Sequence, residues 1–90
     1  MSDWKAVIIG IEYLLMFKKT PSDYVDTMHD AILKRRGISF SREEVLEAIS
    51  ILKSTDIDIS TLLPQPHSNK VLRNFFYKLE EKLNQHKENH

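Results

Sequence analysis

The sequence contains no cysteine, and only two glycines and three prolines stand among its 90 residues. The lack of cysteine excludes a disulfide framework, a thiolate zinc site and a cysteine nucleophile. So few glycines and prolines leave little material for a turn-rich β fold or for a glycine-rich phosphate-binding loop. What remains is ordinary for one small globular domain, because 41% of the residues are hydrophobic and 29% are charged.

The chain also lacks net charge, since 13 basic residues balance 13 acidic ones. A neutral chain has no general electrostatic attraction for nucleic acid or for an anionic membrane. The charge is nevertheless uneven along the chain. Residues 41–58 carry five acidic and two basic side chains, whereas residues 70–90 carry three acidic and five basic ones. This pattern is typical of helices that complement one another within a bundle or across a dimer.

A long hydrophobic run is missing too. The most apolar stretch, residues 4–17, is interrupted by Lys5, Gly10 and Glu12. It is shorter than the roughly 20 apolar residues that a membrane-spanning helix needs. Asp3 precedes it, whereas a signal peptide begins with basic residues. We therefore expect buried, mature structure here, in a cytoplasmic protein without membrane contact.

Apolar residues recur at helical spacing in four stretches of the chain. The spacing predicts an all-α fold, a small bundle of four helices over about 3–18, 21–36, 42–53 and 69–85. A further short helical turn is a candidate near 58–63, with an extended piece at Ile57 and Ile59 as its alternative; a lone strand is not stable, so the turn is favoured. We expect one domain over 1–85 and a polar tail over 86–90 that frays.

Start and stop signals separate these helices. Thr20, Pro21 and Asp23 predict a first capping box, and Ser41 with Glu44 predicts a second. Gly37, which follows three consecutive cations, is expected to adopt the left-handed conformation that ends a helix.

The first predicted helix is apolar on two sides. One face carries an ordinary core stripe of Trp4, Val7, Ile8, Ile11, Leu14 and Leu15. The opposite face carries Ala6 and the five residues that we predict as a partner or dimer interface, Ile9, Gly10, Tyr13, Met16 and Phe17. Lys5, Glu12 and Lys19 leave only a narrow polar band between the faces. Either the other three helices surround this helix or a second chain covers it, and we favour a homodimer. Gly10 is either a tolerated glycine or a point of close approach to a neighbouring helix.

No pattern in the sequence points to catalysis or metal binding. Asp56 to Ser60 has the D-x-D-x-S start of a calcium loop, but the sixth position is Thr61 and the twelfth is His67. His86 and His90 have metal-ligand spacing without a suitable third ligand. A G-x-S-x-G elbow and a phosphate-binding loop are both missing. We therefore expect no enzyme activity, no cofactor and no metal.

These observations favour a non-enzymatic small helical regulator or adaptor that acts through protein–protein interaction. The alternative is a DNA- or RNA-binding regulatory protein. It would use the cations Lys34, Arg35 and Arg36 together with Lys70 and Arg73 of the last helix. A helix-turn-helix reading fails, because residues 55–61 contain two aspartates and no cation where the recognition helix should lie.

Overall fold

The computed structural model describes the backbone of residues 3–88 and the side chains of residues 3–85. These residues form four α-helices, two 3-10 turns and no strand, which confirms the all-α prediction. The helices are α1 (Trp4–Leu15), α2 (Val25–Lys34), α3 (Arg42–Lys53) and α4 (Asn69–Glu88). The turns are η1 (Pro21–Tyr24) and η2 (Ile59–Thr61). Within the described part of the chain, no helix is both long and apolar enough to cross a membrane.

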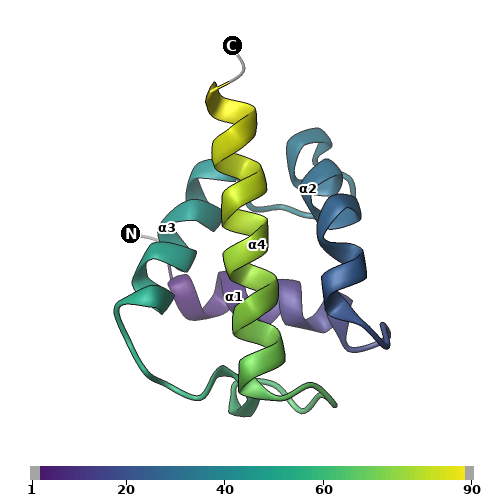
Figure 1. Cartoon of the computed structure of the whole chain (residues 1–90), viewed down its shortest axis with the longest axis vertical. Coiled ribbons are helices and arrows are strands. Elements are labelled where there is room, and N and C mark those ends of the chain that lie inside the picture. The colour runs from purple at the N-terminus through teal and green to yellow at the C-terminus, as the bar shows by residue number, and fades with distance from the viewer. Residues whose placement is uncertain (1–2, 89–90) are drawn as a thin grey trace.

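The longest helix, α4, organises the bundle. It runs along the long axis of the molecule, with α3 on one side and α2 on the other, while α1 crosses behind its lower half (Figure 1). Contacts join α1 to α3 and join α4 to both α2 and α3. Each of the four helices contributes one face to a shared core. We call the other face of α1, which carries the exposed Tyr13, its outer side.

The core combines residues from all four helices with two from the connections, Ile38 and Ile59. α4 contributes Leu72, Phe75, Phe76, Leu79 and Leu83, all fully buried, and α1 contributes Val7, Ile8, Ile11 and Leu15. The rings of Phe75 and Phe76 meet edge to face, with centroids 5.4 Å apart. The predicted inner stripe of α1 is therefore core, with Trp4 and Leu14 partly buried at its margins.

Of the two predicted capping boxes, the structure contains one. The backbone N–H of Glu44 donates to Ser41 Oγ at 3.1 Å, and the N–H of Ser41 donates to Glu44 Oε1 at 2.9 Å. The box at Thr20 is wrong, because its side chain makes no capping hydrogen bond. Pro21 opens a 3-10 turn in which the N–H of Asp23 donates to the carbonyl oxygen of Thr20. That N–H is therefore not available to the side-chain oxygen of Thr20.

Several helix ends differ from the predicted ones. α1 ends at Leu15, and α2 ends at Lys34 because Arg35 already has a left-handed backbone, φ 55°. Gly37 is left-handed as predicted, with φ 73°. The predicted turn near 58–63 is confirmed as η2, where the N–H of Ser60 donates to Asp58 Oδ1. α4 continues to Glu88, so part of the predicted tail 86–90 is helical, and residues 89–90 lie outside the described residues.

Candidate protein-docking surface on α1

Two aromatic side chains project from the outer side of α1. Tyr13 is 55% exposed and Phe17, just past the end of the helix, is 75% exposed. Because they are four residues apart, their rings meet edge to face, with centroids 6.0 Å apart. Phe17 is thus held against a neighbour rather than free in solvent. An aromatic pair exposed to this degree is unusual on a protein surface that contacts only water.

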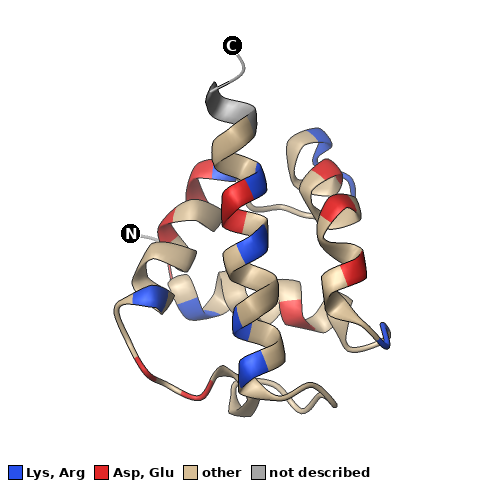
Figure 2. Cartoon of the chain, viewed as in Figure 1, with Lys and Arg blue, Asp and Glu red and all other residues tan. Residues whose placement is uncertain are grey.

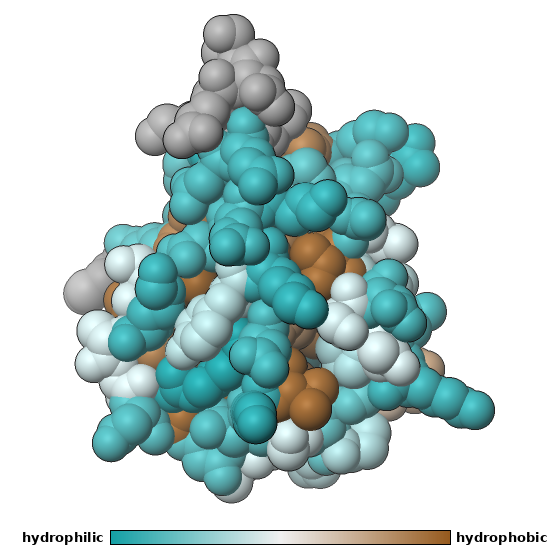
Figure 3. All heavy atoms as spheres, viewed as in Figure 1, coloured by the Kyte–Doolittle hydropathy of each residue, from teal (hydrophilic) through white to brown (hydrophobic). Residues whose placement is uncertain are grey.

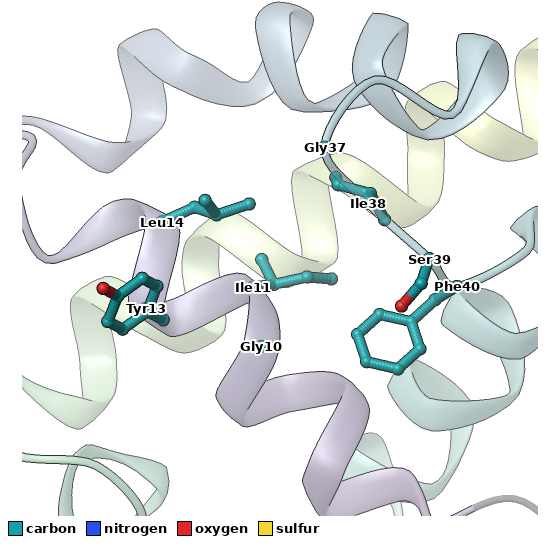
Figure 4. Close-up of a pocket in the computed structure, with 8 residues that line it drawn as sticks. All are labelled: Gly10, Ile11, Tyr13, Leu14, Gly37, Ile38, Ser39 and Phe40. Atoms are coloured by element: carbon teal, nitrogen blue, oxygen red, sulfur yellow. The ribbon is translucent and has the colours of Figure 1, made fainter.

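A pocket of about 330 Å³ lies beside this pair, between α1 and the connection from α2 to α3. Its lining consists of Gly10, Ile11, Tyr13, Leu14, Gly37, Ile38, Ser39 and Phe40. Figure 4 shows Tyr13 at one side of this space and Phe40 at the other, with Ile11 and Ile38 between them. Since most of the lining side chains are apolar, the pocket suits an apolar or aromatic group. We call Ala6, Tyr13, Phe17 and this pocket the α1 docking surface.

Gly10 forms the floor of the pocket and is a point of close approach. A Cβ atom at this position would lie 2.7 Å from Cε2 of Phe40. Of the two sequence-based interpretations, a tolerated glycine or close approach to a neighbouring helix, the structure supports a close approach, but by a ring from the connection that precedes α3 rather than by a helix. Glycine here lets the ring of Phe40, the residue before the α3 cap, pack closely against α1.

The five residues predicted as an interface do not share one degree of exposure. Tyr13 and Phe17 are exposed, whereas Ile9, Gly10 and Met16 are half-buried. The second apolar face of α1 is therefore neither fully core nor fully free. The set remains a prediction, and its exposed part coincides with the α1 docking surface.

The expectation that Glu12 belongs to a solvated polar band is wrong. Its side chain is fully buried, and neither carboxyl oxygen has a hydrogen-bond partner among the described residues. Burial raises the pKa of this carboxyl from 4.5 to about 7. The reason is positional, because Glu12 is four residues after Ile8 and three before Leu15, on the buried side of the helix.

The cations of the alternative nucleic-acid site do not come together. The C-terminal end of α2, which carries Lys34, lies at the opposite end of the long axis from the N-terminal end of α4, which carries Lys70 and Arg73 (Figures 1 and 2). Lys34 also forms an ion pair with Asp30 at 3.1 Å. Arg35 and Arg36 are exposed.

Arg73 is occupied within the chain. Its guanidinium donates to the carbonyl oxygens of Leu52, Thr55 and Ile57 at 3.2, 2.9 and 2.7 Å. It therefore caps the end of α3 and fixes the connection that follows. The sequence alone pointed to Arg73 only as a nucleic-acid contact and did not reveal this role, because its acceptors are 16 to 21 residues away in the chain.

The face around α4 has less exposed apolar surface than the outer side of α1. The face formed around α4 is covered mainly by hydrophilic side chains, with small apolar areas between the helices (Figure 3). No group of three or more histidine, aspartate or glutamate side chains in the described part of the chain is placed to hold a metal ion. No family model, curated protein or solved structure matches this chain. A functional proposal must therefore depend on the geometry of the α1 docking surface.

Proposed function

We propose that this protein is a non-enzymatic regulator or adaptor that binds a protein partner through the α1 docking surface. The observation that carries the proposal is the pocket of about 330 Å³ directly beside the exposed pair Tyr13 and Phe17. Protein interfaces concentrate their binding energy in aromatic anchors and in the pockets that receive them. Many protein complexes form when the apolar face of a helix binds in an apolar groove of the partner.

The apolar area at this site is large enough to matter. Tyrosine and phenylalanine side chains bury about 150–250 Å² each when they are covered. Covering about 200 Å² of exposed area on this pair, at about 25 cal/mol per Å², contributes about 5 kcal/mol before the costs of association. That amount supports reversible rather than permanent binding, which suits a regulator.

Affinity capture with matched variants tests the proposal. The wild type, Tyr13→Glu and Val71→Glu are immobilised in an extract of the native host, and the captured proteins are identified by mass spectrometry. Val71, 40% exposed on α4, is the control because it is also an exposed apolar residue. We expect a defined partner to be retained by the wild type and by Val71→Glu and lost from Tyr13→Glu. Equal capture by all three proteins would count against the α1 docking surface.

A second candidate, a DNA- or RNA-binding regulator, has the exposed Arg35 and Arg36 in its favour. It has less support than protein binding, because Lys70 and Arg73 lie at the other end of the molecule and Arg73 is bonded within the chain. A salt titration separates the two. Binding to nucleic acid that falls steeply as salt rises would favour this candidate. No binding at low salt would remove it.

A further inference from the structure

We infer that the partner on the α1 docking surface is a second copy of this chain, bound with the two α1 helices antiparallel across a two-fold axis. The inference rests on the proposed docking function and names the partner for it. In a two-fold dimer the same surface must complement itself. The order of residues along α1 meets that requirement in three ways.

The first is the spacing of the outer residues. Ala6, Gly10, Tyr13 and Phe17 follow one another at intervals of four, three and four. This is the spacing of a seam along which two helices pack side by side. Ala6, Tyr13 and Phe17 are exposed, and Gly10 opens onto the pocket. The seam is therefore open at Ala6, Tyr13 and Phe17. At Gly10, which the ring of the chain's own Phe40 partly covers, it is open only toward the pocket.

The second is the order of sizes within the seam. Its N-terminal half has two small residues, and its C-terminal half has two aromatic ones. An antiparallel pair centred between Ile11 and Glu12 places Phe17 opposite Ala6 and Tyr13 opposite Gly10. Tyr13 of each copy then faces the pocket of the other, which lies between that copy's own Tyr13 and the Phe40 ring that packs against Gly10. A parallel pair would instead place Phe17 against Phe17 and Tyr13 against Tyr13, and it would leave Ala6 facing Ala6 across unfilled space.

The third is charge. Asp3 is exposed at the start of α1, and Lys18 and Lys19 are exposed just past its end. The antiparallel arrangement brings Asp3 of one copy near Lys18 and Lys19 of the other, and it also opposes the two helix dipoles favourably. A parallel arrangement would bring Lys18 and Lys19 of one copy near those of the other, whereas at the start of the helix the exposed Lys5 offsets the charge of Asp3. A contact formed mainly by one pair of short helices is smaller than a standard interface, so we expect a reversible dimer.

Sedimentation equilibrium over about 10 µM to 1 mM tests the association. We expect the wild type and Val71→Glu to show the same concentration-dependent dimer. We expect Tyr13→Glu to dissociate at least tenfold more readily, because it places a charge in the partner's apolar pocket. Far-UV circular dichroism confirms that each variant is folded. If Tyr13→Glu unfolds, Phe17→Ala replaces it in the sedimentation experiment, because this substitution only removes an exposed ring.

A wild type that stays monomeric at about 1 mM would overturn the inference and leave the proposed function to the capture experiment. A dimer that Tyr13→Glu and Phe17→Ala both leave intact would overturn it as well. The proposed function itself would be overturned by a different pair of results. Tyr13→Glu would then capture the same proteins as the wild type and would also self-associate to the same extent.

Zero-length carbodiimide cross-linking tests the antiparallel order. Asp3 and Lys18 of one chain are 15 residues apart, which is about 22 Å along a helix and too far for a direct amide bond. Mixing ¹⁵N-labelled with unlabelled protein identifies links between copies. A link from Asp3 to Lys18 or Lys19 of the other copy is the expected result. A dimer that forms without this link would overturn the antiparallel arrangement.

Discussion

The buried carboxyl of Glu12 makes the stability of this protein depend on pH. Its pKa is 4.5 in ordinary surroundings and about 7 in the folded chain, because burial disfavours the charged form. The folded state therefore binds this proton more tightly than the unfolded state does. The corresponding stabilisation is fully present below pH 4.5 and is lost as pH rises through 7. The difference corresponds to about 3 kcal/mol. Urea denaturation at pH 5 and pH 8 should show the lower unfolding free energy at pH 8.

Glu12→Gln is the matched control for this prediction, because glutamine has nearly the same shape and no titrating proton. We expect the variant to be more stable than the wild type at pH 8 and to lose most of the difference between pH 5 and pH 8. Asp26 acts in the opposite direction at lower pH, since its hydrogen bond with Lys82 holds the pKa of this carboxyl below 3.8. An unchanged pH dependence in Glu12→Gln would show that another group is responsible.

At the scale of single elements, the two helix starts form a natural comparison. Ser41 accepts a hydrogen bond from the N–H of Glu44, whereas the Thr20 side chain makes no capping hydrogen bond. Ser41→Ala should therefore lower the unfolding free energy by about 1 kcal/mol. Thr20→Ala should change it by much less. Thermal and urea unfolding of both variants check this difference, and equal losses would contradict the observed caps.

Arg73 makes several hydrogen bonds to the end of α3 and to the start of the connection that leads to α4. Its guanidinium donates to the carbonyl oxygen of Leu52 in α3 and to those of Thr55 and Ile57 in the connection. A hydrogen bond to a charged group contributes about 1.5–3 kcal/mol to stability. Arg73→Ala should lower the unfolding free energy by about 3 kcal/mol. Arg73→Lys should restore little, because one ammonium group cannot span three acceptors.

Lys70→Ala is the control for Arg73, since Lys70 is exposed on the first turn of the same helix. Amide hydrogen exchange gives a local measurement. We expect faster exchange at residues 54–59 in Arg73→Ala than in Lys70→Ala. Equal exchange in the two variants would mean that the connection is held by other contacts, such as the hydrogen bond from His67 Nε2 to the Leu15 carbonyl at 2.9 Å.

Apolar spacing and capping residues predicted the helices well. They did not predict the contacts between segments that lie far apart in the sequence. The existence of all four helices follows from apolar spacing, and the Ser41 box follows from residues three apart. Glu12 was misplaced because residue type outweighed position, although its spacing from Ile8 and Leu15 already placed it on the buried side. The roles of Arg73 and of Phe40 over Gly10 depend on which segments meet in space. A pattern within one helix carries no information on that.

At the scale of the whole molecule, the net charge of a stretch does not by itself predict which side chains pair across two helices. The acidic stretch 41–58 and the basic stretch 70–90 suggested attraction between α3 and α4. Among the described side chains, one ion pair between these helices, Lys53 with Glu80 at 2.9 Å, has the opposite sense. A second pair, Lys82 with Asp26 at 2.7 Å, joins α4 to α2. Partly exposed pairs of this kind contribute little, so apolar burial rather than charge sets the packing.

The folded core extends along α4 as far as Leu83. Leu83 is fully buried near the end of α4, and its carbonyl oxygen accepts hydrogen bonds from Arg42 Nε and Nη2 at 3.3 and 3.0 Å. Ending the chain after Gln85 keeps the side chain and both hydrogen bonds, so we expect the melting temperature to change by only a few degrees. Ending it after Lys82 removes the Leu83 side chain and leaves Arg42 without its acceptor. Removing a buried leucine alone costs about 2–5 kcal/mol, a large part of the stability of a domain this small. Since about 1 kcal/mol shifts the melting temperature by 4–8 °C at this size, the shorter chain should melt at least 10 °C lower. Similar melting of the two truncated chains would show that the core ends before Leu83.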